Sequence, residues 1–215
     1  MEKRLQLSEI FKSIQGESSF AGLPCTFIRL AGCNLRCSYC DTVYAYEPSS
    51  ELTVEEILAE VAALSCPLVE ITGGEPLLQE EVYPLMAELL RQGYQVLLET
   101  NGTIDLTAVD PRVVVIMDIK CPGSGQSEKV LWDNLKRLKE KDQVKFVLSH
   151  RQDYVWARRV IEKHGLDKKC LLLFSPAYGS LSARDLAQWI LSDGLKVRLQ
   201  LQLHKIIWGA EARGV

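Results

Sequence analysis

The sequence predicts an α/β protein built as a partial (β/α)6-type TIM barrel that is open on one side. Segments with strand character alternate with segments with helix character along the whole chain, which favours parallel strands joined by right-handed crossovers. About six such units can be counted, fewer than a closed eight-stranded barrel needs. No linker, repeat or low-complexity tract interrupts them, so residues 1–215 are expected to form a single domain. The alternation alone would also fit a doubly wound sheet.

Each predicted strand is a short apolar run bounded by glycine, proline or polar residues. The predicted strands are Arg4–Phe11, Thr26–Leu30, Leu68–Thr72, Gln95–Thr100, Val113–Ile119, Val144–Leu148, Leu171–Phe174 and Val197–Leu203. The predicted helices are Val54–Leu64, Glu81–Arg91, Leu131–Lys139, Tyr154–His164 and Ala183–Leu191. Thr53 is placed to cap the first of these helices, with Glu56 three residues on, and Gly165 is placed to end the fourth. Segments 48–50 and 123–125 are expected to be loops.

Polar residues follow the predicted strands at their carboxyl ends, where barrels place their chemistry. The strand ends are Arg29, Thr72–Pro76, Glu99–Gly102, Asp118–Lys120, Ser149–His150, Ser175–Pro176 and His204–Lys205. A single end of this kind is ordinary turn chemistry, because glycine, asparagine, serine and proline all favour turns. All of them together at one rim predict a site there, and this observation decides in favour of the barrel.

The segment Cys33–Cys40 holds three cysteines with the spacing C-x3-C-x2-C. Thiolates are soft ligands that suit iron–sulfur clusters, zinc or copper(I). An electron-transfer [4Fe–4S] centre usually has four thiolates, but no fourth cysteine follows at short spacing. Three thiolates would leave one iron open to a substrate or cofactor. A structural zinc with a fourth ligand from elsewhere, or simple packing of the thiols, remains an alternative for this segment alone.

The segment Thr72–Pro76, Thr-Gly-Gly-Glu-Pro, is the second strong signal. Two glycines let a ligand approach the backbone closely, and exposed carbonyls together with Glu75 would suit an ammonium group. A plain strand-to-loop turn is the alternative. The segment follows the cysteines by one strand–helix unit, which favours the binding role.

Composition excludes several classes of protein. The chain is 47% hydrophobic and 25% charged, with a net charge of −3 and a pI of about 5.7, so nothing indicates a nucleic-acid or anionic-membrane partner. No apolar run has membrane-spanning length, and the N-terminus has no signal-peptide core. Seven cysteines, clustered and odd in number, favour a reducing cytoplasm over a disulfide framework.

Together these motifs resemble the radical S-adenosylmethionine (SAM) superfamily, in which an aromatic residue, here Tyr39, precedes the third cysteine and a Gly-Gly-Glu-Pro stretch binds SAM. Within it, the chain is similar to the 7-carboxy-7-deazaguanine synthase family over nearly its whole length. The segments that carry this resemblance are Ser13–Glu17, Phe27–Gly32, Cys40–Thr42, Thr72–Pro76, Glu99–Gly102, Asp118–Lys120 and Leu201–Lys205.

The resemblance implies a carbon–nitrogen lyase of queuosine and 7-deazapurine biosynthesis, a tRNA modification pathway. Such an enzyme converts 6-carboxy-5,6,7,8-tetrahydropterin to 7-carboxy-7-deazaguanine with loss of ammonia. A [4Fe–4S] cluster, SAM used as a regenerated cofactor, and Mg²⁺ are implied with it. A 5′-deoxyadenosyl radical formed from SAM would abstract hydrogen from the pterin C6. An external reductant such as flavodoxin or ferredoxin, a homodimer and a cytoplasmic location are implied as well.

The resemblance also assigns roles to residues at the matching positions. Cys33, Cys37 and Cys40 would hold the cluster, and Thr42 the magnesium. Contacts to SAM would come from Tyr39, Asp41, Gly74, Glu75, Lys120 and Ser149. Contacts to the substrate would come from Ile14, Gln15, Gly16, Glu17, Arg29, Thr72 and His204.

Three substrate residues have open alternatives. A planar guanidinium such as Arg29 can pair bidentately with the pterin carboxylate, but a structural ion pair at a strand end is also consistent with it. Glu17 would accept from the guanidine-like edge of the pterin or be an exposed loop charge. His204 would reach the substrate or pack.

Two other functions remain open: activation of a partner enzyme by forming a glycyl radical, and a non-enzymatic zinc protein. The segment Gln15–Glu17 argues against the first. The chain departs from the family at Ala210, where proline often follows Trp-Gly. The cysteines expected only to pack are Cys25, Cys66, Cys121 and Cys170.

Overall fold

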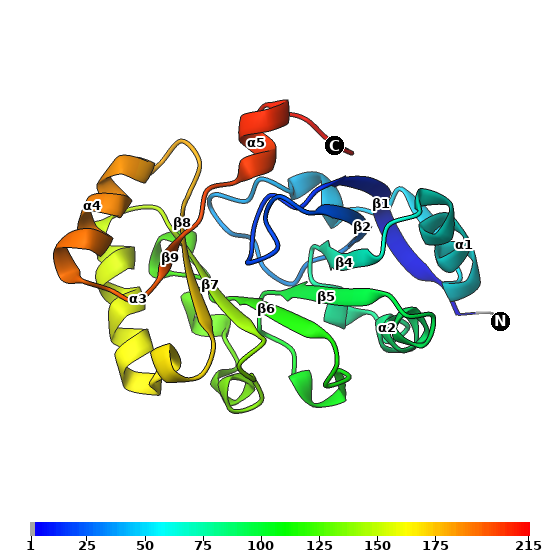
Figure 1. The fold of residues 1–215 in the computed structure, drawn as a ribbon, viewed down its shortest axis with the longest axis horizontal. Helices are drawn as coiled ribbons and strands as arrows, with labels where there is room; N and C mark the ends of the chain where they lie inside the picture. Colours follow the sequence, from blue (N-terminus) through cyan, green and yellow to red (C-terminus); the bar gives the residue numbers. More distant parts are fainter. Residues whose placement is uncertain (1–2) are drawn as a thin grey trace.

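The computed structural model describes residues 3–215, which share one nine-stranded sheet (Figure 1). The strands are β1 (Leu5–Ile14), β2 (Pro24–Leu30), β3 (Ser50–Leu52), β4 (Leu68–Gly73), β5 (Gln95–Thr100), β6 (Val114–Asp118), β7 (Gln143–Leu148), β8 (Leu171–Pro176) and β9 (Arg198–Leu199). The helices are α1 (Val54–Leu64), α2 (Val82–Arg91), α3 (Arg151–His164), α4 (Ala183–Asp193) and α5 (Leu203–Trp208).

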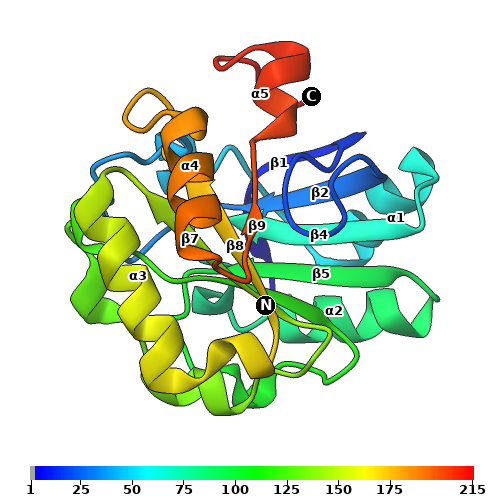
Figure 2. The ribbon, with the colours of Figure 1, turned by 60° about the vertical axis from the view of Figure 1, so that its left-hand side comes forward.

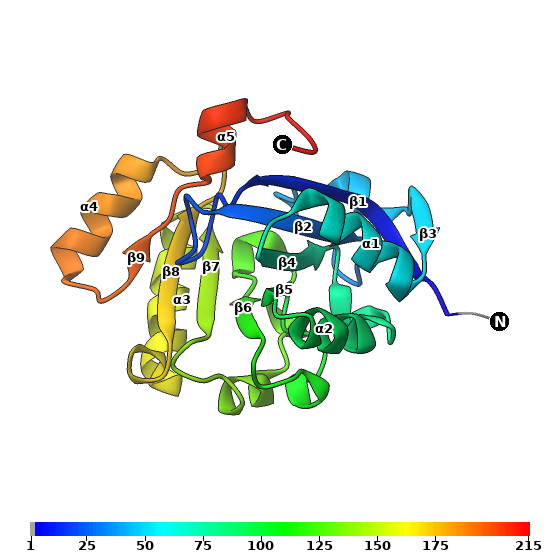
Figure 3. The same cartoon turned by 45° about the vertical axis from the view of Figure 1, so that its right-hand side comes forward.

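The order of strands across the sheet is β3-β1-β2-β4-β5-β6-β7-β8-β9. From β2 to β9 every neighbouring pair is parallel, whereas β1 is antiparallel to β2 and to β3. The order never reverses along the parallel part, so the sheet is not doubly wound. It curves without closing, with α1 and α2 beside its first half and α3 and α4 beside its second (Figures 1 and 3). The predicted partial barrel is confirmed.

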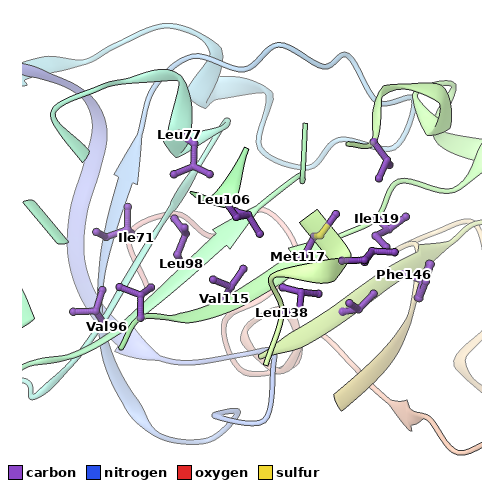
Figure 4. Packing of buried hydrophobic residues seen from close by; sticks show 14 of the residues in the cluster. Ile71, Leu77, Val96, Leu98, Leu106, Val115, Met117, Ile119, Leu138 and Phe146 are labelled. Carbon is purple, nitrogen blue, oxygen red and sulfur yellow. The ribbon is translucent and has the colours of Figure 1, made fainter. Parts of the chain in front are cut away.

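Side chains alternate between the two faces of each parallel strand, and this divides the core in two. The outward-facing residues of the strands pack with the helices in the larger cluster, part of which is shown in Figure 4; it includes Ile71, Leu98, Val115, Met117 and Phe146. The intervening residues form a smaller cluster inside the barrel, made of Cys25, Phe27, Cys66, Leu68, Leu97, Val114 and Ile116. Burial of this apolar surface stabilises the fold at about 25 cal/mol for each Å².

Helix α1 begins and ends at the predicted residues. Its capping box is complete, because Glu56 N donates to Thr53 Oγ1 (3.2 Å) and Thr53 N donates to Glu56 Oε2 (2.8 Å). Helix α3 begins three residues earlier than predicted, at Arg151, and ends at Gly165 with φ +59°. Within residues 3–215 no helix combines the length and apolarity that a membrane span requires.

Two predicted elements are wrong. Leu131–Lys139 is not an α-helix but contains a 3-10 helix at Trp132–Lys136. Its buried Asn134 accepts a hydrogen bond from Leu106 N (3.0 Å) and donates to Gly102 O (3.1 Å) and Ile104 O (2.8 Å). These contacts hold the segment against the loop after β5, which favours a tight turn over a regular helix.

The second wrong element is the predicted last strand, Val197–Leu203. Only Arg198–Leu199 pairs with the sheet, and the chain turns away after Gln200 N donates to Phe174 O (2.8 Å). Leu203 instead begins α5, which stands beyond the end of β9 and apart from α3 and α4 (Figure 2). Ser50, expected in a loop, begins β3.

Candidate active site

The cysteine loop leaves the end of β2 and is anchored to the loop after β6. Ser38 N donates to Ser124 O (3.1 Å), and Ser38 Oγ donates to Gly123 O (2.7 Å). Within the loop, Leu35 N donates to Sγ of Cys33 (3.4 Å). All three loop thiols are free and partly buried, so they are held near the surface at one end of the barrel.

Burial raises the pKa of Cys33 and raises that of Cys37 to about 11, while the Lys120 ammonium lowers both. Cys40 adds to both shifts, so the three sulfur atoms lie close enough to affect one another. As the side chains lie, no three Cys, His, Asp or Glu residues within 3–215 surround a single ion position. Three soft thiols of one loop, beside a cation that favours thiolates, fit a cluster in which each thiolate binds a different iron.

Gly73 and Gly74 bring the end of β4 against the start of the cysteine loop. A Cβ atom on Gly74 would overlap the carbonyl oxygen of Gly32 and lie 2.9 Å from Cβ of Cys33. Gly74 N also donates to Leu30 O (3.1 Å). Gly74 is therefore required by the close approach of two backbones, and any side chain there would displace the cysteine loop.

The Glu75 carboxylate is fully buried between β4 and β5. Its oxygens accept hydrogen bonds from Asn101 N (2.7 Å), Thr100 Oγ1 (2.8 Å) and Leu77 N (3.1 Å). Burial raises the pKa of Glu75, and the Asn101 amide acts in the opposite direction. These donors explain how a carboxylate can lie in the interior. The contact of Glu75 with SAM stays a prediction.

An ion pair stands at the end of β6, where Lys120 Nζ lies 2.8 Å from Asp118 Oδ2. Burial lowers the pKa of Lys120, but the charge of Asp118 together with those of Cys37 and Tyr39 holds the pKa above its ordinary value. The other oxygen, Asp118 Oδ1, is buried and has no hydrogen-bond partner among residues 3–215. Buried acceptors without partners are uncommon and costly, so Asp118 is a candidate ligand contact that the predicted SAM contacts did not include.

Two further predicted SAM contacts use their hydroxyl groups inside the protein. Tyr39 OH donates to Val147 O (3.2 Å), and Ser149 Oγ donates to Asp153 Oδ2 (2.7 Å). The first bond ties the cysteine loop to β7, and the second fixes the loop after β7 to α3. Their contacts with SAM stay predictions.

The inner face of the barrel becomes polar toward the carboxyl ends of its strands, above the apolar inner cluster. The inward-facing polar residues of β2 and β4 to β7 are Arg29, Glu70, Thr72, Glu99, Asp118 and Lys145. Each lies two residues along from an inward-facing neighbour, because strand side chains alternate. The alternation therefore brings charged groups from five strands into one interior space.

Gln15 and Glu70 form a buried pair in this interior. Gln15 Nε2 donates to Glu70 Oε2, and Gln15 Oε1 accepts from Glu17 N (2.8 Å). Burial, followed by the nearby Glu99 charge, raises the pKa of Glu70 well above its usual value. Both ends of the Gln15 amide are therefore engaged within the protein, and the predicted contact of Gln15 with substrate stays a prediction.

The predicted alternative for Arg29 exists in the structure: its Nε lies 2.7 Å from Glu9 Oε1, and Tyr44 OH donates to the same oxygen (2.9 Å). No hydrogen bond among the described residues uses the two terminal nitrogens of Arg29. The ion pair therefore orients the guanidinium without occupying the two N–H groups that a carboxylate would bind. Pairing with the pterin carboxylate stays a prediction.

Lys145 lies at the centre of the inner polar group and was not among the predicted site residues. Its Nζ is 2.8 Å from Glu17 Oε2, contacts Glu99 Oε1 and is 3.5 Å from Asp118 Oδ2. Only 5% of Lys145 is exposed. A lysine inside the apolar strand Val144–Leu148 was a signal present in the sequence, because lysine is almost never fully buried unless paired.

Helix α5 covers the end of β1. Leu203 N donates to Gly16 O (3.0 Å). A Cβ atom on Gly16 would overlap His204 Nδ1, so glycine is needed for the helix to lie this close. Thus Gly16 and His204, both predicted to contact substrate, pack directly together, and Ile14 lies just before them, partly buried at the end of β1.

Gln202, which precedes α5, contacts both the loop after the third cysteine and the polar interior of the barrel. Its Nε2 donates to Glu17 Oε1 (3.0 Å) and to Asp41 Oδ2 (3.2 Å). Asp41 Oδ1 in turn accepts from Thr42 Oγ1 (3.0 Å). One amide therefore connects the loop that follows the third cysteine with the carboxylate group inside the barrel.

The sequence matches the Radical SAM superfamily over residues 27–140. The 7-carboxy-7-deazaguanine synthase of Chlorobaculum tepidum is 50% identical over 100% of this chain and 99% of its own length. That of Koribacter versatilis is 47% identical over 98% and 100%. The chain belongs to the 7-carboxy-7-deazaguanine synthase family of radical SAM enzymes.

Solved structures show the same fold. QueE from Escherichia coli superposes with a TM-score of 0.77 at 24% identity, covering 94% of this chain and 95% of its own. Streptococcus suis SuiB bound to S-adenosylmethionine gives 0.56 at 14% identity, covering 79% of this chain and 48% of SuiB.

Membership in this family confirms the resemblance found in the sequence. It implies a [4Fe–4S] cluster and SAM, and so favours the cluster over zinc at the three cysteines. The family also favours the synthase over activation of a partner enzyme.

Proposed function

We propose that the chain converts 6-carboxy-5,6,7,8-tetrahydropterin to 7-carboxy-7-deazaguanine with loss of ammonia, as a carbon–nitrogen lyase of queuosine and 7-deazapurine biosynthesis. The observation that carries this proposal is the bridge from Asp41 through Gln202 to Glu17. It places a carboxylate-rich interior next to the cysteine loop, so a substrate held inside the barrel would lie beside the radical source.

The interior matches the chemistry of a carboxylated pterin. The guanidine-like edge of a pterin carries N–H donors, which the carboxylates of Glu17 and Glu99 accept. The pterin carboxylate would pair with the terminal nitrogens of Arg29, which its ion pair with Glu9 already orients. Charge-assisted hydrogen bonds of both kinds are directional and about twice as strong as neutral ones.

Cys33, Cys37 and Cys40 would hold the [4Fe–4S] cluster, which with SAM supplies the radical that abstracts hydrogen from the pterin C6. The protein supplies orientation and shielding. Gly74 lets the end of β4 lie close against the cysteine loop, and Lys120 lies beside the cysteine loop to favour thiolates. His204 and the rest of α5 cover the end of the barrel and limit the access of water.

Magnesium would bind at Thr42, together with oxygen atoms of the substrate. Mg²⁺ prefers six oxygen ligands and often retains waters or substrate oxygens among them. The Thr42 hydroxyl donates to Asp41 Oδ1 (3.0 Å), which leaves the lone pairs of its oxygen available for the ion.

Partners complete the proposal. A flavodoxin or ferredoxin would deliver the electron, and the enzyme would work in the cytoplasm without a nucleic-acid or membrane partner. A homodimer is supported by large apolar side chains that remain exposed near β9 and α5; these are Tyr178, Leu199, Leu201, Ile206, Ile207 and Trp208. Exposed apolar side chains gathered in one region often mark a protein interface.

The test is a mass-spectrometric assay on protein that is purified and reconstituted without oxygen. SAM, a chemical reductant, Mg²⁺ and 6-carboxytetrahydropterin are added, and 7-carboxy-7-deazaguanine and 5′-deoxyadenosine are measured. Cys37→Ala is compared with Cys170→Ala, which removes a thiol outside the loop.

Product from the wild type and from Cys170→Ala, but not from Cys37→Ala, is the expected result. If 5′-deoxyadenosine forms without the deazaguanine, the substrate assignment is wrong. If iron analysis finds zinc in place of iron and neither product forms, the enzyme assignment is wrong as well.

A further inference from the structure

Lys145 is the cation on which three elements of the barrel converge. Glu17 comes from the loop after β1, Glu99 from β5 and Asp118 from β6, and all three carboxylates lie within 3.5 Å of its Nζ. The stem of Lys145 leaves β7 between Val144 and Phe146, whose side chains point to the opposite face and belong to the larger core cluster.

The charges around Lys145 would repel one another without it. Glu17, Glu99 and Asp118 surround one ammonium, and the Glu70 carboxyl lies close enough to feel the same charges. Burial raises the pKa of Glu17, but the Lys145 charge and the hydrogen bonds from Lys145 and Gln202 together hold that pKa below its usual value. Removal of one member of a buried ion pair leaves an uncompensated charge, so Lys145 keeps these carboxylates together in a space of low dielectric.

The same contacts fix which carboxylate oxygens remain available. Lys145 binds Oε2 of Glu17 and Oε1 of Glu99, and Gln202 binds Oε1 of Glu17. Oε2 of Glu99 takes part in no hydrogen bond among residues 3–215. Because Lys145 determines the rotamer of the Glu99 head, it also determines where this free oxygen points.

We propose that Lys145 is a positioning residue that fixes Glu17 and Glu99 as acceptors for a paired N–H edge of the substrate. The ligand class is a planar heterocycle with a guanidine-like edge, and the inference rests on the proposed function. Lys145 does not touch the reacting carbon. Its main effect is on substrate binding, because its Nζ is closer to Glu17 Oε2 (2.8 Å) than to Asp118 Oδ2 (3.5 Å).

Two variants test the positioning role of Lys145. Lys145→Met removes the charge and keeps a similar stem, and Lys145→Arg keeps the charge but moves the donors away from the two glutamate oxygens. Lys136→Met and Lys136→Arg are matched controls, because Lys136 is exposed and, among residues 3–215, forms its ion pair with Asp133 alone. Each protein is assayed for thermal unfolding, SAM binding, product formation, and binding of the stable fluorescent probe 6-carboxypterin.

For Lys145→Arg we expect an unchanged melting temperature and an unchanged SAM affinity. The affinity for 6-carboxypterin should fall and the KM for the substrate should rise, each about 10- to 100-fold, as expected for the loss of hydrogen bonds to charged groups. Lys145→Met should lower the affinity for 6-carboxypterin at least as much. The uncoupled formation of 5′-deoxyadenosine in the absence of pterin should stay at the wild-type level. Neither Lys136 variant should change any of these values.

Wild-type probe affinity and KM in Lys145→Arg would overturn the inference and leave the lysine with a purely structural role. Lys145→Arg decides the question even if Lys145→Met does not fold. Absence of deazaguanine from the wild type would instead refute the proposed function, and that outcome is seen before any variant is compared.

Discussion

Nζ of Lys205 lies 2.5 Å from Oδ2 of Asp41, across 164 residues of chain. Lys205 also lies 5.0 Å from the centre of the Tyr178 ring. The pair joins α5 to the residue that follows the third cysteine, so the cover of the barrel and the cysteine loop are held by one contact. The ammonium side chain is 8% exposed and the carboxylate 49% exposed.

Lys205→Met should loosen α5 without destabilising the protein greatly. An ion pair with a half-exposed partner contributes about 0–1 kcal/mol to the free energy of unfolding. Amide hydrogens of α5 should therefore exchange about 2- to 5-fold faster, while those of β4 to β6 do not change. Lys196→Met, at an exposed lysine before β9, is the control. Equal exchange in α5 of both variants would show that the ion pair does not hold the helix.

Gly74→Ala should displace the cysteine loop. The added methyl group would overlap Gly32 O and approach Cys33 Cβ, so the backbone of the cysteine loop and a predicted cluster ligand would have to move. Iron bound per chain after anaerobic reconstitution should fall well below the wild-type value. Gly22→Ala controls for loss of a glycine, because Gly22 has φ +95° and open space around its Cβ position; it should cost about 1 kcal/mol of stability yet retain iron. Full iron content in Gly74→Ala would contradict this account.

Glu70→Gln should change how stability depends on pH. Burial and the Glu99 charge raise the pKa of Glu70 in the folded protein, so the folded state holds this proton more tightly than the unfolded state does. The resulting stabilisation is complete below the unfolded pKa of about 4.3 and is lost as the pH rises toward the folded pKa. Glutamine stays neutral and can still accept from Gln15.

The stability of Glu70→Gln relative to the wild type should therefore increase as the pH rises above the unfolded pKa of about 4.3, by at most about 1.4 kcal/mol for each pH unit. Urea unfolding at several pH values measures this difference, and Glu60→Gln, at an exposed position of α1, controls for loss of a carboxylate. A difference that is constant with pH would show that Glu70 is not held protonated.

Thr53→Ala should lower the free energy of unfolding by about 1 kcal/mol, because it removes one half of the capping box of α1. Thr53 is buried and its hydroxyl accepts from Glu56 N. Urea unfolding gives the value, and Ser192→Ala in the exposed last turn of α4 should be neutral or slightly stabilising. A Thr53→Ala protein as stable as the wild type would mean that Glu56 alone caps the helix.

Elements set by local patterns were predicted closely. Helix α1 and strand β5 have the predicted bounds, because a capping box and a short β-rich apolar run act within a few residues. The helix predicted over Leu131–Lys139 was wrong because Asn134 makes its hydrogen bonds with a loop about 30 residues earlier in the chain. No window of sequence around Asn134 contains those partners.

The site also combines features that are local in sequence with contacts between distant residues. Cysteine spacing, the Gly-Gly-Glu-Pro segment and the polar strand ends are local in sequence, and these features identified the family and predicted where its chemistry lies. Lys145 was missed because its partners, Glu17 and Glu99, come from elements far away in the chain.

The sequence by itself determined the fold class and the family, since spacing and strand alternation are properties of neighbouring residues. The cluster ligands and the rim that holds the site stay predictions. Only the tertiary structure decided that α5 covers β1, that Gln202 bridges Asp41 and Glu17, and that one lysine gathers three carboxylates. The physical reason is that the strength of a charge contact depends on distance and burial, which a sheet of nine strands sets between residues more than 100 positions apart.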